Sequence, residues 1–186
     1  MNQEAYDRLM KQEEQGEPPQ DALSFRRFLS NHGLRLGTPE HFFYAEEKDF
    51  CPKPIPKAVE VRALQETDRV SFNEMTKASS SEDLEAGFVE LDHPLVFGAF
   101  VKGKRVSRSS AFSFDQEKWI FDIGYVTHPN YRNQGLGALC ASELTKRIFA
   151  TQKIPQIRVE PQRKASIGIA KSLGYPFYGI LEYDEK

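Results

Sequence analysis

Two glycines one residue apart, Gly135 and Gly137, stand where a strand pattern gives way to a helix pattern. The preceding segment, IFDIGYVT at residues 120–127, is rich in β-branched and aromatic side chains, which favour a strand. Residues 134–151 carry apolar side chains at intervals of three and four, the spacing of one helix face. Because glycine costs a helix about 1 kcal/mol relative to alanine, two glycines at this helix start need a physical reason.

The junction has the composition of an anion-binding turn. The N–H groups of a first helical turn lack intrahelical partners and lie at the positive end of the helix dipole. A phosphate reaches them only if no Cβ blocks its approach, and Arg132 adds a charge-assisted contact. The segment RNQGLG therefore predicts a phosphate or pyrophosphate site. Close helix packing is the alternative explanation for the glycines.

Two better-known phosphate motifs do not match this junction. A Walker A loop needs Gly-x-x-x-x-Gly-Lys-Ser/Thr, which the chain lacks. The dinucleotide fingerprint needs a third glycine, and Cys140 occupies that place. The remaining pattern, Arg/Gln-x-x-Gly-x-Gly/Ala between a strand and a helix, is complete as Arg132, Gly135 and Gly137.

Two segments, GYVTHPNYRNQGLG and IPQIRVEPQRKASIGIAKSLGY, resemble the GNAT acyltransferase superfamily, and particularly its FR47-like bacterial members. The likeness covers residues 58–186 and includes the predicted element order, βααβββαβαβ. It implies an α/β (α+β) fold in which helices flank a mixed, mostly antiparallel sheet. It also implies an N-acetyltransferase (EC 2.3.1.-) that uses acetyl-CoA as co-substrate and no metal.

The resemblance also implies which residues hold the CoA. Val126 and Thr127 would bind the pantetheine arm through their backbone, and Ser166 would contact CoA. The loop would hold the pyrophosphate through backbone N–H groups and one side chain; its residues are Arg132, Gln134, Gly135, Leu136, Gly137 and Ala138.

Catalysis would be direct attack of an amine on the thioester carbonyl, which needs a base. Asp122 is the only carboxylate between Trp119 and Asn130, and it is the base candidate; a solvent-facing strand residue is the alternative. Arg163 and Ala170 stand where the family commonly has Asn and Tyr. Ala170 cannot protonate the departing thiolate. A GNAT-like module that binds acyl-CoA without turnover is therefore the second function that the sequence leaves open.

The composition limits the classes of partner that we expect for this chain. The 25 basic and 27 acidic residues leave a net charge of −2, which argues against a nucleic-acid-coating protein. No apolar run approaches the roughly 20 residues that cross a bilayer. The two cysteines, Cys51 and Cys140, form neither a disulfide framework nor a metal-ligand spacing. We expect a cytoplasmic protein with a small-molecule or peptide amine as acceptor.

The chain divides by pattern near residue 56. Residues 1–55 read as a helical appendage, with helices at 2–15 and 21–33, that ends in a proline-rich linker. Residues 56–186 read as the GNAT acetyltransferase domain. An exposed edge of the predicted sheet could pair with a second copy to give a homodimer.

Overall fold

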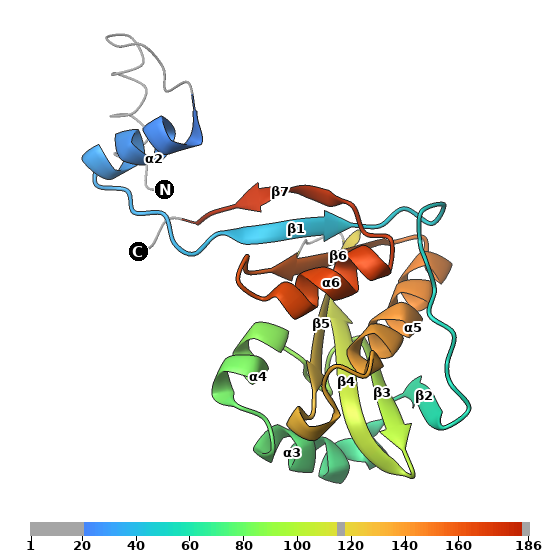
Figure 1. Cartoon of the computed structure of the whole chain (residues 1–186). Coiled ribbons are helices and arrows are strands. Elements are labelled where there is room, and N and C mark those ends of the chain that lie inside the picture. Colours follow the sequence, from blue (N-terminus) through green and yellow to red (C-terminus); the bar gives the residue numbers. More distant parts are fainter. Residues whose placement is uncertain (1–20, 115–117, 184–186) are drawn as a thin grey trace. The chain divides into compact units, whose positions relative to one another are not determined.

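One mixed sheet of seven strands, in the order β2-β3-β4-β5-β6-β1-β7, organises the chain (Figure 1). We obtained it as a computed structural model, which describes residues 21–114 and 118–183. The expected fold class, a mixed and mostly antiparallel sheet with flanking helices, is confirmed.

The first half of the sheet follows the order of the chain. Its strands pair antiparallel with their neighbours in sequence; they are β2 (Val59–Ala63), β3 (Leu95–Val101), β4 (Lys104–Phe112) and β5 (Ile120–Thr127). Lys102 and Gly103, both with positive φ, turn the chain between β3 and β4. The two strands therefore form a hairpin.

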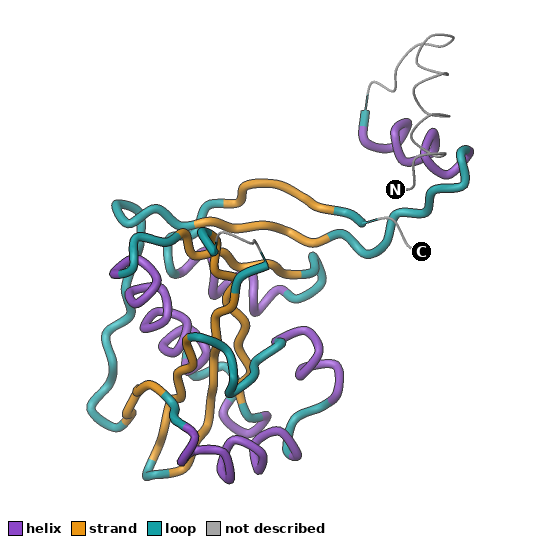
Figure 2. The backbone as a smooth tube through the Cα atoms, turned by 180° about the vertical axis from the view of Figure 1, so that it is seen from behind, coloured by secondary structure: helices purple, strands orange, loops and turns teal. Residues whose placement is uncertain are grey.

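The second half combines distant segments. Its strands are β6 (Ile154–Val159), β1 (Glu40–Tyr44) and β7 (Phe177–Leu181). Strand β1 pairs antiparallel with β6, and it lies beside β7 in Figures 1 and 2. Its Phe43 is 1% exposed in the core, although it belongs to the predicted appendage. The division of the chain at residue 56 stays a prediction.

The two halves meet at β5 and β6, which are parallel but separate early. Their pairing, among the residues described, runs only from Ile120↔Ile154 to Asp122↔Gln156. Strand β5 then continues to Thr127 and β6 to Val159, and the two strands run apart (Figure 1). We call this divergence the seam.

Helices cover both faces of the sheet. The odd residue Ile123 of β5 packs with α5 (Leu136–Ala150) and α6 (Lys164–Ser172). The even residue Val126 packs instead with α3 (Arg69–Lys77), and α4 (Ser81–Gly87) contacts the same strand. Because adjacent side chains of a strand point to opposite faces, α3 lies on the face opposite α5 and α6.

Residues 21–40 and 180–183 belong to a second compact unit. It contains α2 (Ala22–Asn31), whose first turn is capped by Asp21 through the Ser24 N–H at 2.7 Å. The predicted helix at 21–33 is thus confirmed, whereas the one at 2–15 lies outside the described residues. Within the described part of the chain, no helix has the length and apolar character to cross a membrane.

Candidate active site

The loop between β5 and α5 has the backbone geometry of a tight turn. It begins with a short helix, η2 (Pro129–Tyr131), and ends at the first residue of α5. Asn133 (φ 61°) and Gly135 (φ 76°) both have a left-handed backbone conformation. A Cβ on Gly135 would meet no atom within 4 Å, so backbone conformation rather than crowding accounts for this glycine.

Gly137 has a different reason. A Cβ at this position would lie 3.1 Å from the Thr127 hydroxyl oxygen and 3.4 Å from the Ile169 side chain. Gly137 therefore lets the first turn of α5 lie against β5 and α6, so the packing explanation holds for this residue.

The helix start presents free hydrogen-bond donors. The Leu139 N–H donates to the Gly135 carbonyl at 3.1 Å, the first bond of the α5 ladder. By helix geometry, the N–H groups of Leu136, Gly137 and Ala138 therefore have no intrahelical acceptor. They and the open space at Gly135 give the loop donors for an anion, at the end of the helix where the dipole is positive.

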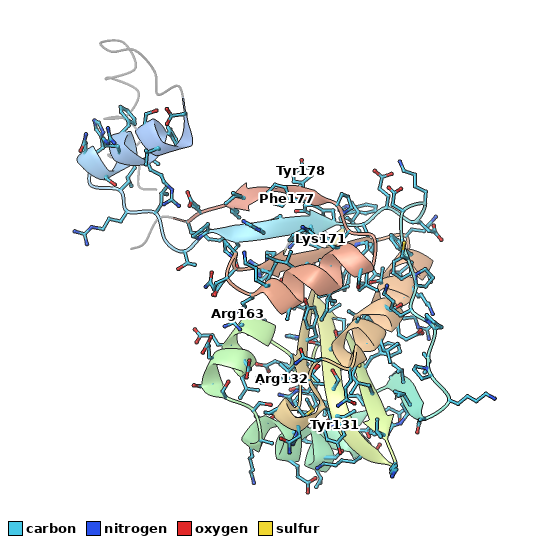
Figure 3. All side chains as sticks on the ribbon, in the orientation of Figure 1. Tyr131, Arg132, Arg163, Lys171, Phe177 and Tyr178 are labelled. Carbon is cyan, nitrogen blue, oxygen red and sulfur yellow. The ribbon has the colours of Figure 1, made fainter. Side chains whose placement is uncertain are left out.

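Two arginines, one in this loop and one at the start of α6, reach the same helix, α4 (Figure 3). Arg132 donates to Asp83 at 2.6 Å and, through Nε, to the Thr127 carbonyl at 3.4 Å. Arg163, at the start of α6, donates to Glu82 at 3.1 Å. Both acidic residues belong to the first turn of α4. One guanidinium group of the loop and one at the start of α6 thus have carboxylate partners on the same helix.

The seam exposes one backbone edge of β5. The Ile154 N–H of β6 donates to the Trp119 carbonyl. Because the backbone N–H and C=O groups of alternate strand residues point to the same neighbouring strand, those of every second residue of β5 after Trp119 point toward β6. Tyr125 and Thr127 follow that alternation, so their N–H and C=O groups lie along the seam. The backbone of Val126 is directed to β4 instead, opposite Arg108. The CoA contact expected of Val126 stays a prediction.

The residues on the α6 side of the seam are partly or fully buried. The Tyr125 hydroxyl donates to the Ser166 carbonyl at 3.1 Å, and burial raises the pKa of Tyr125 to about 12. Ala170 is fully buried. The hydroxyl of nearby Tyr175 bonds Thr145 in the core at 2.6 Å, and burial raises its pKa as well.

Asp122 stands at the last paired position before the seam opens. It is 7% exposed, and its two oxygens accept from Gln156 Nε2 at 3.1 Å and from Arg158 Nε at 2.9 Å. Burial raises the pKa of Asp122, and the charge of Arg158 opposes that rise. The alternative of a solvent-facing Asp122 is therefore wrong, while its role as a base stays a prediction.

An aromatic wall, which we define as Phe88, His93, Phe112 and Phe114, adjoins Asp122. The rings of His93 and Phe112 are stacked with centroids 4.7 Å apart, and Phe114 meets Phe112 edge-on at 4.5 Å. The Arg158 guanidinium lies 4.3 Å from the Phe114 ring centroid. The wall thus connects to the Asp122–Arg158 ion pair through Phe114.

A family model for GNAT acetyltransferases matches residues 38–183. The chain belongs to the GNAT acetyltransferase family, a class of acyltransferases (EC 2.3.1.-). Among curated proteins, none matches this sequence.

Solved structures of GNAT proteins share the fold at low identity. A GCN5-related N-acetyltransferase from Kribbella flavida is 18% identical with a TM-score of 0.59 over 81% of this chain and 59% of its own. A GNAT-family acetyltransferase from Colwellia psychrerythraea is 16% identical, with a TM-score of 0.62 over 81% of this chain and 57% of its own. A GCN5-related N-acetyltransferase-like protein from Streptococcus suis is 19% identical, with a TM-score of 0.55 over 94% of this chain and 74% of its own. The chain thus spans under two thirds of the first two.

Sequence reasoning missed the aromatic wall and Arg158 of this GNAT chain. They come from three separate segments: the stretch between α4 and β3, the end of β4, and β6. Each is an ordinary apolar or charged residue in its own segment, and no spacing relates them. The only local signal is Phe88, whose left-handed φ of 40° ends α4, and that backbone angle is not visible in a sequence.

Two buried arginines hold α3 of the GNAT chain on β4. Arg108, 1% exposed, donates to the Phe72 carbonyl at 3.0 Å and lies 4.0 Å from the centroid of that residue's ring. Burial lowers the pKa of Arg108 to about 10. Arg105 contacts Asp68 at 3.2 Å. These contacts fix the helical layer beside the aromatic wall.

Proposed function

We propose that the chain transfers an acetyl group from acetyl-CoA to a primary amine of a small-molecule or peptide acceptor. One observation carries the proposal: the edge of β5 that β6 leaves after Asp122 leads directly into a loop of anion-binding geometry. An extended chain that ends in a pyrophosphate fits such an arrangement, because the edge offers backbone hydrogen bonds and the loop offers N–H donors.

The CoA contacts that we propose are those of the family resemblance, and this geometry supports them. The pyrophosphate would lie against Arg132 and the backbone N–H groups of residues 134–138, namely Gln134, Gly135, Leu136, Gly137 and Ala138. The pantetheine arm would pair with the backbone of Tyr125 and Thr127, with Val126 between them and Ser166 on the α6 side. An anion on the loop would compete with Asp83 for the Arg132 guanidinium.

The chemistry we propose is direct attack in a ternary complex. The amine lone pair attacks the thioester carbonyl carbon, and the carbon–sulfur bond breaks with its electron pair on sulfur. A backbone N–H of the open β5 edge would polarise the carbonyl oxygen. Asp122, at the last paired position of that edge, is the base predicted from the sequence.

A second candidate function is an acyl-CoA-binding module without turnover. Ala170 favours it, because a buried methyl group offers no proton to a thiolate on the α6 side. The Tyr125 hydroxyl, which also lies on the α6 side, already donates to the Ser166 carbonyl.

Thermal unfolding with and without acetyl-CoA tests the binding site. At 100 times its dissociation constant, a ligand stabilises a protein by about 2.7 kcal/mol, which raises the melting temperature of a chain this size by roughly 5–11 °C. We expect Gly135→Glu to abolish the rise. The matched control is Gly33→Glu, because Gly33 (φ 78°) also has open space around it but lies in the second unit. No rise in the folded wild type would contradict acetyl-CoA binding.

Release of free CoA thiol, measured with each of a panel of amines, then separates the two functions. The panel is spermidine, kanamycin, lysine, 2-phenylethylamine and a peptide with a free N-terminus. Turnover with any of them supports the transferase. Binding of acetyl-CoA without turnover supports the module.

A further inference from the structure

His93 is held rigidly at the aromatic wall. It lies between α4 and β3, and its ring stacks on Phe112 and leans on Phe88, whose centroid is 5.4 Å away. Its Nδ1 lies 2.8 Å from the Ser110 hydroxyl oxygen. Two ring contacts and one hydrogen bond therefore fix both the position and the rotation of the imidazole.

Strand register places this ring beside the seam. Ser110 of β4 stands opposite Gly124 of β5, and Phe112 stands opposite Asp122. Directly opposed residues project on the same face of a sheet. His93 therefore lies on the same face of the sheet as Asp122. It covers the part of β4 that pairs with β5 at the point where β6 separates from β5.

The imidazole has the properties of a base. Its burial lowers the pKa of His93, and the charges of Glu90 and Asp92 oppose that shift, although Asp92 is itself paired with Arg69 at 2.7 Å. If Nδ1 carries the proton and donates to Ser110, the lone pair is on Nε2. Among the described residues, no group hydrogen-bonds to His93 Nε2.

Asp122 is less suited to the same task. Each of its oxygens accepts a hydrogen bond, and its negative charge balances Arg158 in a largely buried ion pair. Protonation of Asp122 during the reaction would leave the Arg158 charge without that partner, which is costly in a buried site.

We propose that His93, rather than Asp122, is the base that deprotonates the acceptor amine, directly or through one water. The inference rests on the proposed transferase function. As the amine nitrogen forms its bond to the carbonyl carbon, its proton passes to His93 Nε2. The carbon–sulfur bond breaks with its electron pair on sulfur, and the proton then passes from His93 to the CoA thiolate or to solvent. The products are the acetylated amine and CoA.

The test is the pH dependence of kcat for the panel amine that turns over fastest, measured in wild type, His93→Gln and Asp122→Asn. We expect His93→Gln to lower kcat by roughly 10²–10⁴-fold. The variant should keep the acetyl-CoA-induced rise in melting temperature and lose the acidic limb of the pH profile. Added imidazole should restore part of the rate. The matched control is His41→Gln, because His41 also packs on an aromatic ring, Phe177 at 5.3 Å, and should leave kcat unchanged.

Ser110→Ala provides a second variant should His93→Gln fail to fold. It keeps the imidazole and removes the hydroxyl that holds Nδ1, so kcat should fall and the acidic limb should move to lower pH. An unmoved limb would contradict the proposal.

Each outcome separates the hypotheses. A His93→Gln enzyme with wild-type kcat and an unchanged limb overturns the role of His93 and leaves the transferase function intact. Loss of the limb in Asp122→Asn alone makes Asp122 the base. A wild-type protein that binds acetyl-CoA but turns over no amine overturns the transferase function, and His93 as base falls with it.

Discussion

The two halves of the sheet differ in how the chain builds them. In the first half, β2 to β5 lie side by side in chain order, so a tight turn or a short connection brings most partners together. In the second half, β1 lies between β6 and β7, more than 100 residues away in sequence. Short-range pairing explains the first half, whereas only long-range pairing can complete the second.

The candidate site lies where the halves meet. A parallel pair needs a long crossover, here α5, and β5 and β6 pair over only three positions. The seam is thus the junction where two parallel strands start together and then separate. The site needs both halves, because the loop and the His93 face come from the first and Arg158 comes from the second.

The largest effect should come from removing β1. Deletion of residues 1–55 leaves β6 without its partner along His41↔Val159 to Tyr44↔Gln156 and takes Phe43 from the core. We expect loss of cooperative unfolding in urea, followed by circular dichroism. Deletion of residues 1–37 keeps β1 and should retain the transition. Equal stability of the two truncations would support the boundary predicted at residue 56.

The next effect should come from the first half, at Gly124 on β5. A Cβ there would lie 1.8 Å from the backbone oxygen of Gly87 at the end of α4, so α4 must move. We expect Gly124→Ala to cost about 3 kcal/mol of unfolding free energy. Gly168→Ala on α6 is the control, since its Cβ meets nothing within 4 Å and should add about 0.5–1 kcal/mol. Equal urea midpoints for the two variants would contradict this close packing.

The same contrast explains what the sequence could predict. The loop at Arg132, Gly135 and the start of α5 was predictable, because consecutive residues carry its whole pattern. The order of the strands and helices from β2 onward followed from local sequence patterns. The insertion of β1 between β6 and β7 and the environment of Asp122 were not predictable, because they depend on register between distant segments. No signal in the sequence pointed to His93, because the orientation of its ring depends on contacts with Ser110 and Phe112 of another element.

A smaller effect should appear at Asp68, which ties β2 to β4 within the first half. Its carboxylate accepts from both terminal nitrogens of Arg62, each at 2.8 Å, and lies 3.2 Å from Arg105. These hydrogen bonds and charges hold the pKa of Asp68 well below its usual range. We expect Asp68→Asn to cost about 2 kcal/mol at pH 7, less than a fully buried pair because Arg62 is 42% exposed.

The pH dependence has a defined sign. A carboxyl whose pKa is lower in the folded state stabilises the fold above its unfolded pKa of about 3.9, and this contribution is lost as the pH falls from that value through the lower folded-state pKa. Between pH 5 and pH 2 the wild type should therefore lose more unfolding free energy than Asp68→Asn. The extra loss should be of the same order as the difference between the two proteins at pH 7. Urea midpoints at each pH measure this, and parallel curves for the two proteins would contradict the assigned ion pair.

The smallest effect should distinguish the two glycines of the loop. Gly135→Ala meets no atom but must adopt a φ of 76°, which costs about 1 kcal/mol. Gly137→Ala keeps a helical backbone and brings its methyl group 3.1 Å from the Thr127 hydroxyl, a contact that we expect a small shift of α5 against β5 to relieve. If the seam holds CoA, that shift moves the N–H donors relative to the open edge of β5. Gly137→Ala should then weaken acetyl-CoA binding, measured by calorimetry, with little change in the urea midpoint. Gly135→Ala should lower both, because its methyl group enters the space open to the anion and its φ is strained. Equal effects of both variants on both quantities would mean that the glycines act through a single shared constraint.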